Sequence, residues 1–173
     1  MVNEQDEAIG VMEKMEAHEK ALLHRAFSVF IFNKDGLMLL QQRALTKYHS
    51  PGLWTNACCS HPRPGEDVKS AALRRLNEEL GFSVNVEKAF DFTYRAVFDN
   101  GLTEHEFDHV FVGVYDGAIQ PAPEEVRAVI YKSMNAIADD IVSVPQDYTE
   151  WFKIAFPLLK AWMEKNRIVH AGS

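Results

Sequence analysis

The stretch Gly65–Gly81, GEDVKSAALRRLNEELG, carries the strongest secondary-structure signal in the chain. Glu66 and Asp67 stand where a helix dipole favours negative charge, and Gly81 is the residue type that commonly ends a helix. Between these ends an apolar side chain recurs at every fourth position, at Val68, Ala72, Leu76 and Leu80. This spacing predicts a helix with one apolar stripe that packs on a core, and with its charged residues on the polar sides.

The segments on both sides of this helix have the composition of strands. Arg25–Phe32 and Leu37–Gln42 flank an Asn-Lys-Asp-Gly turn and are expected to form a hairpin. Phe82–Val97 and Leu102–Tyr115 are expected to form a second strand pair around an Asp-Asn-Gly turn. Strands before and after one strong helix indicate an α+β fold, in which helices cover a mixed β-sheet.

Two further helices are expected near the ends of the chain. Glu4–Leu23 is rich in Glu, Met and Ala and has few breakers apart from Gly10. From about Asp147 to Asn166, apolar residues recur at helical spacing across Pro157, which can kink a helix. The sequence between Pro121 and this last helix is mixed, and we assign no element there.

Composition excludes several classes of protein. The chain has 173 residues, with 18 Lys and Arg against 25 Asp and Glu, for a formal net charge of −7. A 47% hydrophobic content supports one sizeable core, so we predict a single domain over residues 1–173 rather than a disordered chain. An acidic protein is a poor binder of nucleic acid, and no apolar run approaches the roughly 20 residues that cross a bilayer. We therefore expect neither nucleic-acid nor membrane binding.

The number and spacing of the cysteines indicate the cellular compartment of the protein. Cys58 and Cys59 are the only cysteines and are neighbours, so they cannot cross-link distant segments. A reducing, cytoplasmic location is expected. For the assembly we expect a monomer or a weak homodimer.

The sharpest local motif is Thr55–Pro62, TNACCSHP, in which a thiol lies two residues from an imidazole. Such a pair at the end of a strand suits a nucleophile, an acid/base pair or a metal site. Free cysteines more often pack as small hydrophobes, and this is the interpretation for Cys58. For Cys59 the nearby His61 makes packing and chemistry about equally plausible.

A second motif, Glu104–His109, reads EHEFDH. In a strand, Glu104, Glu106 and Asp108 share one face, and His105 and His109 share the other. If the acidic face is solvated, the run is an ordinary exposed hairpin. If it is buried, the face needs a cation or a proton, because unpaired buried carboxylates are too costly to keep ionised. Both alternatives stay open at this level.

Histidines elsewhere extend this acidic motif to a candidate metal site. His18 and His24 bracket the expected junction between the first helix and the first strand. Together with His61, Glu104 and Glu106 they offer three imidazoles and two carboxylates, a set that suits a divalent transition metal or magnesium. Spacing alone does not show that these segments converge, and a lone histidine is more often a surface or core residue.

Three separated motifs resemble one known family. The runs TNACCSHP, EDVKSAALRRLNEELGF and YRAVFDNGLTEHEFDHVF are similar to those of the type I isopentenyl-diphosphate isomerases of the Nudix superfamily, in the expected order over about Lys14 to Trp151. The chain departs from the general Nudix box at Ser60, where Gly is expected, and at Arg75, which replaces the Glu after the box arginine. The isomerase branch shares this Arg-Arg variation, whereas a Nudix hydrolase needs that acid for its metals.

The resemblance implies a metal site, a substrate site and a catalytic set. Its metal ligands fall on His18, His24, His61, Glu104 and Glu106, and the ion there is Zn²⁺, Mn²⁺ or Mg²⁺. A second ion, Mg²⁺, arrives with the diphosphate and is held through Glu79. The cations that meet the diphosphate are Lys14, Arg43, Lys47 and Arg75. Without the resemblance, Arg75 and Glu79 would be interpreted as an ordinary surface ion pair on one helix.

The implied reaction converts isopentenyl diphosphate to dimethylallyl diphosphate through a tertiary carbocation. It needs an acid and a base on opposite sides of the substrate. The resemblance assigns these roles to Cys59 and to Glu106 assisted by Tyr94, with Glu106 as the proton donor or with the direction reversed. The indole of Trp151 is expected to stabilise the cation, and Trp54 is the other candidate.

Two other functions compete with isomerisation. A Nudix-type hydrolase of a small diphosphate compound uses a similar site for a different reaction. A non-catalytic metal-binding or scaffold protein accounts for the histidines but leaves Cys59 unexplained.

Overall fold

Two long strands run parallel through the middle of the computed structural model, which describes residues 1–166. β1 (His24–Phe32) pairs with β6 (Thr103–Val114) from His24 opposite Glu106 to Phe32 opposite Val114. The other strands are β2 (Met38–Arg43), β3 (Trp54–Thr55), β4 (Cys58–Ser60), β5 (Val86–Val97) and β7 (Val126–Lys132). They form one seven-stranded sheet in the order β3-β2-β1-β6-β5, with β4 beside β1 and β7 beside β2.

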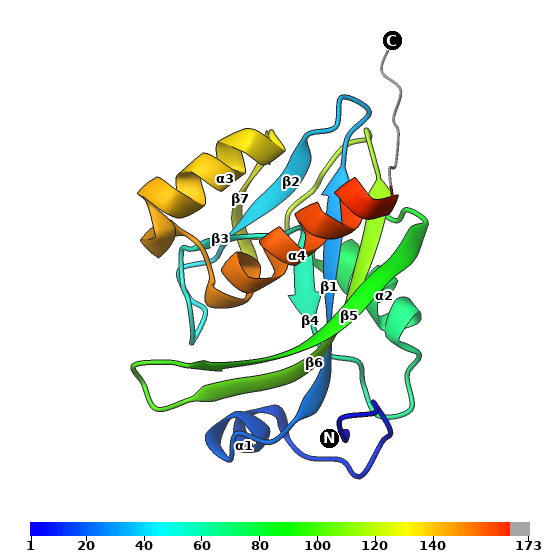
Figure 1. Ribbon diagram of the computed structural model, residues 1–173, viewed down its shortest axis with the longest axis vertical. Helices are drawn as coiled ribbons and strands as arrows, with labels where there is room; N and C mark the ends of the chain where they lie inside the picture. Colours follow the sequence, from blue (N-terminus) through cyan, green and yellow to red (C-terminus); the bar gives the residue numbers. More distant parts are fainter. Residues whose placement is uncertain (167–173) are drawn as a thin grey trace.

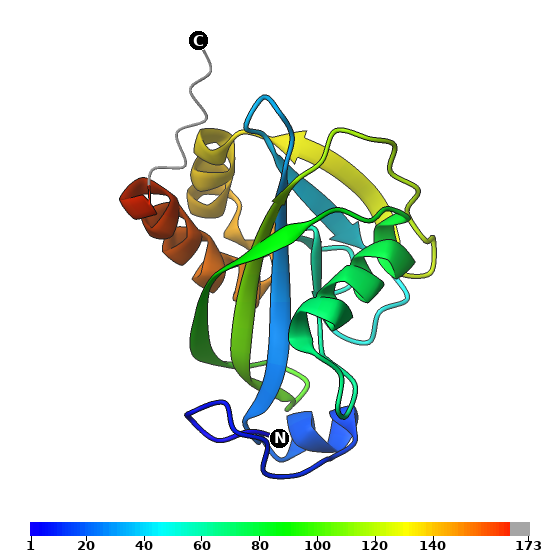
Figure 2. The same cartoon turned by 90° about the vertical axis from the view of Figure 1, so that its right-hand side faces the viewer.

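Helices cover both faces of this sheet (Figures 1 and 2). α2 (Val68–Leu80) lies on one face, and α3 (Met134–Ser143) and α4 (Glu150–Asn166) lie on the other. Alternate residues of β1 feed the two cores, with Phe27 and Val29 packed on the α2 side and Phe30 on the α4 side. The predicted α+β fold with a mixed sheet between helices is confirmed.

The signals at the ends of α2 act as predicted. The Asp67 carboxylate accepts a hydrogen bond from the Ser70 N–H at 2.9 Å and caps the helix. Gly81 ends it in the left-handed conformation, with φ of 73°. Three residues of the apolar stripe, Ala72, Leu76 and Leu80, are fully inaccessible, and Val68 at the start of the helix is partly buried.

The predicted N-terminal helix over Glu4–Leu23 is largely wrong. Only α1 (Lys14–Glu19) is helical. Before it, the Asn3 side chain accepts hydrogen bonds from two following backbone N–H groups, and Asp6 takes a φ of 63° and binds Arg25. These local and tertiary bonds outweigh the helix propensity of the segment.

The structure also corrects the sheet. β1 and β2 pair only at their shared turn, where Phe32 lies opposite Met38, because β4 takes the place beside β1 and β2 pairs mainly with β7. β7 and α3 occupy the region for which no element was assigned. The last helix begins at Glu150 rather than about Asp147, after a short 3-10 turn, and continues through Pro157 to Asn166.

Among residues 1–166, no helix is both long and apolar enough to cross a membrane. The predicted domain extends to residue 173, and its last seven residues lie outside the described part of the chain.

The end of α2 gives a test of this fold. A Cβ at position 81 would lie 2.8 Å from the backbone oxygen of Gln120, whereas one at Gly36, which has a similar positive φ, meets nothing within 4 Å. Gly36→Ala is expected to cost about 1–2 kcal/mol, the left-handed penalty alone, and Gly81→Ala clearly more. Urea unfolding of both variants measures the difference. Equal losses would contradict the close packing of Gln120 on the helix end.

Candidate active site

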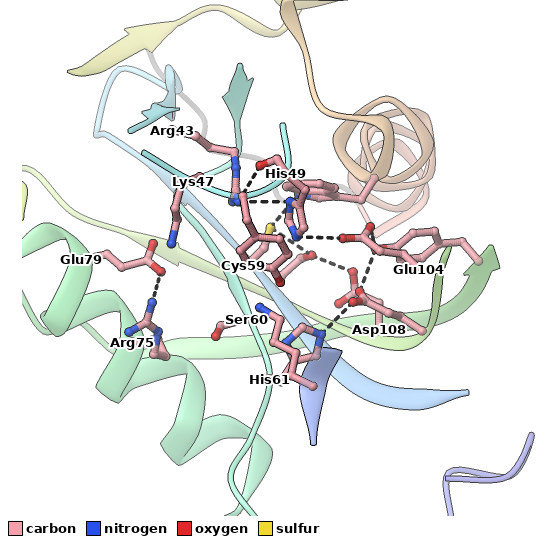
Figure 3. A pocket seen from close by; sticks show the side chains of 16 residues that line it. Arg43, Lys47, His49, Cys59, Ser60, His61, Arg75, Glu79, Glu104 and Asp108 are labelled. Atoms are coloured by element: carbon pink, nitrogen blue, oxygen red, sulfur yellow. Dashed lines mark hydrogen bonds and ion pairs between the residues drawn. The ribbon is translucent and has the colours of Figure 1, made fainter. Parts of the chain in front are cut away.

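A pocket opens on the α4 side of the sheet, over β1, β4 and β6 (Figure 3). Every residue expected in the site lines it except His18 and His24, which lie next to His61 just beyond its wall. The expected residues that line it are Lys14, Arg43, Lys47, Cys59, His61, Arg75, Glu79, Tyr94, Glu104, Glu106 and Trp151. The fold therefore gathers side chains that are up to 137 positions apart in the sequence, from Lys14 to Trp151.

Four of the expected metal ligands form a compact group. One ligand atom each from His18, His24, His61 and Glu106 lies within 4.8 Å of the others. They come from α1, β1, the loop after β4, and β6. Both ring nitrogens of His18 are buried without a hydrogen-bond partner among residues 1–166, which is costly for a polar group unless something binds there.

The hydrogen bond of His24 gives a second reason to expect a cation in this group. Its Nδ1 lies 2.8 Å from the carbonyl oxygen of Leu22 and donates to it, so Nε2 of the neutral ring carries a lone pair. That nitrogen faces Glu106 Oε1 at 3.4 Å. A lone pair opposite a carboxylate oxygen needs a positive charge between or beside them. The donor set, three imidazoles and one carboxylate, fits a divalent metal.

The three carboxylates of β6 are buried, so the exposed-hairpin alternative is wrong. Glu104, Glu106 and Asp108 are 4%, 6% and 2% exposed. Burial alone would raise the pKa of Glu106, but His61 and His24 hold it well below its ordinary value, with His61 Nε2 2.7 Å from Oε1. Burial, together with the charge of Glu106, raises the pKa of Glu104 to about 8 and that of Asp108 well above its ordinary value.

Glu104 lies beside the four-residue group rather than in it. Its Oε2 accepts a hydrogen bond from the Tyr94 hydroxyl at 2.9 Å, and its Oε1 lies 3.6 Å from His49 Nε2. The same Tyr94 hydroxyl lies 2.7 Å from Glu106 Oε2. One phenol proton is thus shared between two carboxylates, and burial with these charges raises the pKa of Tyr94.

The two neighbouring cysteines point to opposite faces of β4. Cys58 is fully buried in the α2 core, whereas Cys59 lines the pocket. The Cys59 thiol donates to Asn56 Oδ1 at 2.8 Å, and Trp151 Nε1–H donates to its sulfur at 3.1 Å. Burial, and then the charge of Asp108, raises the pKa of Cys59 to about 12, so it is a thiol at neutral pH.

Asn56 fixes where the Cys59 proton points. The Asn56 amide nitrogen donates to the carbonyl oxygens of Val29 (3.0 Å) and Cys58 (2.9 Å), so its orientation is set and its Oδ1 must face the sulfur. An amide oxygen only accepts. The sulfur therefore keeps the proton in this arrangement.

Cationic side chains line the opposite wall of the pocket (Figure 3). Arg75 donates to Glu79 at 2.6 Å, and Lys47 pairs with Glu125. Arg43 lies over the Trp151 ring, 5.2 Å from its centre. Nε of Arg43 and of Arg75 is buried with no hydrogen-bond partner in the described chain, which leaves donors available for an anion.

The expectation that Glu79 lies on a polar side of its helix is wrong. It is 5% exposed, because Gln41 on β2 reaches over it and donates to its Oε2 at 2.8 Å. Burial raises the pKa of Glu79. Its pair with Arg75 is consequently a pocket feature rather than an ordinary surface ion pair. Trp54, the alternative to Trp151, lines a different cavity, beside Leu40 and Tyr148.

Six pocket or support residues were not assigned a role from sequence: Ser28, Tyr48, His49, Asn56, Ser60 and Asp108. Ser28 donates to Asp108 Oδ2 at 2.7 Å. Strand alternation was the signal that could have found these two residues, because it places Ser28 and Asp108 on the pocket faces of β1 and β6. Asn56 stood within the quoted motif. His49 belongs to an irregular loop, and no periodic signal marks it.

Comparisons with known proteins agree with this geometry. Residues 22–152 match the NUDIX domain family. The chain is 49% identical over 152 residues to the isopentenyl-diphosphate Delta-isomerase of Serratia proteamaculans, covering 88% of the chain and 85% of that protein. The enzyme of the same name from Pectobacterium atrosepticum is 50% identical over 156 residues, covering 90% and 87%. The chain belongs to the isopentenyl-diphosphate Delta-isomerase family.

Solved structures of other proteins share the fold of this chain. DR0079 from Deinococcus radiodurans superposes with a TM-score of 0.75 at 18% identity, covering 90% of this chain and 94% of that one. The MutT protein from Methanosarcina mazei Go1 superposes with a TM-score of 0.67 at 17% identity, covering 83% of this chain and 95% of that one. At these identities the likeness concerns the fold alone.

The buried imidazoles predict acid sensitivity of the metal-free protein. Burial, reinforced by neighbouring positive charges, lowers the pKa of His18 to about 4 and of His49 to about 3. The unfolded chain binds protons on these residues near pH 6.5 and the folded protein does not, so their contribution to stability falls as the pH drops below about 6.5. Glu104, whose pKa is raised to about 8, contributes in the opposite direction, so the effect of one ring is read from the difference between wild type and a variant. Each histidine contributes at most about 1.4 kcal/mol per pH unit.

Urea unfolding in EDTA from pH 7 to pH 4 measures this slope, and His18→Gln is expected to reduce it. A free-energy difference between wild type and His18→Gln that stays constant over that range would show that the pKa of His18 is not lowered in the fold.

Proposed function

We propose that this pocket isomerises isopentenyl diphosphate to dimethylallyl diphosphate in isoprenoid biosynthesis, with Cys59 and Glu106 as its acid/base pair. The observation that carries the proposal is one buried pocket containing a thiol, a carboxylate bonded to a phenol, and guanidinium groups with free donors. Family membership supports the same reaction, since the named relatives are isopentenyl-diphosphate Delta-isomerases.

The reaction moves protons and leaves the diphosphate bond intact. A proton adds to C4 of the substrate, a tertiary cation forms at C3, and a proton leaves C2. We propose that the Cys59 thiol supplies the first proton and that the Glu106 carboxylate receives the second. The hydrogen bonds support this direction, because the Cys59 sulfur carries its proton and donates to Asn56 Oδ1, and both Glu106 oxygens accept hydrogen bonds or face imidazoles.

The remaining residues support the cation and reset the site. Trp151, 4% exposed, is proposed to stabilise the cation with its ring and to exclude water that would trap it. Its Nε1–H also stabilises the Cys59 thiolate after proton loss. Tyr94 keeps Glu106 oriented through its hydroxyl. Before the next turnover the sulfur regains a proton and Glu106 loses one.

Lys14, Arg43, Lys47 and Arg75 are proposed to bind the diphosphate. Arg75 also supports isomerisation over the hydrolase alternative. It stands where hydrolases of the superfamily place an acid for metal binding, and its guanidinium bonds Glu78 and Glu79 instead. Glu79 is the proposed contact for the Mg²⁺ that accompanies the diphosphate.

His18, His24, His61 and Glu106 would hold a divalent ion, with Glu104 as the proposed fifth ligand. Zn²⁺, Mn²⁺ and Mg²⁺ all suit this donor set. A bound ion supplies fixed positive charge that orients the Glu106 carboxylate and lowers its pKa. The cytoplasmic location stays a prediction, consistent with two free cysteines.

Metal titration of the substrate-free protein tests the ion site. His18→Ala is expected to weaken Mn²⁺ or Zn²⁺ binding by at least about tenfold, because His18 has no other bond to lose. His105→Ala is the control, since that ring lies on the opposite face of β6, with Nδ1 3.1 Å from the carbonyl oxygen of Ala21. Equal affinities for all three proteins would contradict the proposed ligands.

Deuterium exchange in Cys59→Ala tests the proton donor. If Cys59 is the acid, the variant neither forms product nor exchanges C4 protons of isopentenyl diphosphate in D₂O, as followed by NMR. Cys58→Ala is the matched control, with a small stability loss and isomerisation retained. Deuterium at C4 of the recovered substrate would show that Cys59 is instead the base, and unchanged turnover would remove it from the mechanism.

A further inference from the structure

His49 is a buried pocket residue that neither the sequence motifs nor the proposed reaction uses. It lies in the loop between β2 and β3 and is 7% exposed. Figure 3 shows its ring between Arg43 and Glu104. These two residues belong to different parts of the proposed site, the diphosphate subsite and the metal subsite.

Aromatic contacts from four segments hold the His49 ring in place, one of them His18 of α1 at 6.2 Å between ring centres. It stacks on Phe98 at the tip of the β5–β6 hairpin, with 5.8 Å between ring centres and 7° between planes. Trp151 on α4 meets it edge-on at 5.7 Å, and Tyr48 of its own loop at 4.5 Å. With the plane of the ring fixed, each nitrogen has one defined partner.

The partners determine which nitrogen carries the proton. Arg43 Nη2 lies 3.3 Å from His49 Nδ1 and 3.3 Å from the His49 carbonyl oxygen. A guanidinium only donates, so Nδ1 accepts, and in the neutral ring the proton is on Nε2. Nε2 faces Glu104 Oε1 at 3.6 Å.

These contacts orient both neighbours. Arg43 keeps its unpartnered Nε for an anion while one terminal nitrogen is anchored on His49. Glu104 Oε2 accepts a hydrogen bond from the Tyr94 hydroxyl, and its Oε1 lies against the His49 ring, 3.6 Å from Nε2. The side chain of Glu104 is thereby held at the edge of the group formed by His18, His24, His61 and Glu106.

We infer that His49 is a positioning residue that anchors the diphosphate-binding Arg43 through Nδ1 and places its Nε2 against the metal-site carboxylate Glu104. The inference rests on the proposed function for the roles of those two residues. A single substitution at His49 should therefore weaken metal binding and substrate binding together, because each of its ring nitrogens faces a protein group from one of the two subsites.

The test compares three variants by two measurements. His49→Phe keeps the aromatic packing and removes both nitrogens, and His49→Gln keeps one acceptor and one donor. His109→Phe is the matched control, because His109 is also 7% exposed but bonds Asp6 and Lys88 away from the pocket. Mn²⁺ affinity is measured by electron paramagnetic resonance without substrate, and KM for isopentenyl diphosphate is measured at saturating metal.

We expect His49→Phe to weaken Mn²⁺ binding about tenfold and to raise KM about tenfold, the range found when the hydrogen-bond partner of a ligand is removed. His49→Gln should restore most of both values, and His109→Phe should alter neither. Wild-type values for His49→Phe would overturn the inference. Absence of isomerisation by the wild-type protein would contradict the proposed function instead, and the Mn²⁺ titration would still test the link to Glu104.

Nitrogen-15 NMR of the wild-type imidazoles gives a result that does not depend on a variant folding. His49 should carry its proton on Nε2. A proton on Nδ1 would be incompatible with the Arg43 contact and would overturn the inference.

Discussion

The burial of three carboxylates on one face of β6 is the constraint on which the rest of the site depends. Strand alternation places Glu104, Glu106 and Asp108 in the α4-side core, where unpaired charges are costly. Each has a hydrogen-bond partner that offsets part of this cost: Tyr94 lies between the two glutamates, His61 bonds Glu106, and Ser28 donates to Asp108. The parallel pairing of β1 with β6 also brings His24 opposite Glu106, so the topology of the sheet places a further imidazole where a cation is proposed to bind.

The same strand alternation gives the two cysteines of the short strand β4 different surroundings, the core for one and the pocket for the other. Cys58 completes the core under α2, and Cys59, one position further, faces the pocket between Asn56 and Trp151. The acidic character of the whole chain is thus compatible with an anionic substrate. Many of its acids pair with imidazoles or guanidinium groups, and a few cations with free donors remain where the diphosphate is proposed to bind.

Sequence patterns predicted the parts of the fold that depend on local signals. The helix Val68–Leu80 has both ends marked by Asp67 and Gly81, and β1, β5 and β6 have clear apolar patterns. The helix prediction for the N-terminal segment was wrong because Arg25 donates a hydrogen bond to Asp6, 19 positions away, and helix propensity takes no account of such tertiary contacts. The site residues were found through motif resemblance, since no spacing rule joins Lys14 to Trp151. His49 was not identified as a site residue from the sequence. Its position depends on where an irregular loop meets a hairpin tip and a helix, and only the folded chain determines this.

The central claim is that these buried groups move protons on a five-carbon diphosphate without breaking its phosphate bonds. Proton NMR of the metal-loaded wild-type protein with isopentenyl diphosphate in D₂O tests it most directly. The account predicts dimethylallyl diphosphate with deuterium in a methyl group and no free phosphate. Release of phosphate from this substrate or from a nucleoside diphosphate derivative, with no shift of the double bond, would contradict it.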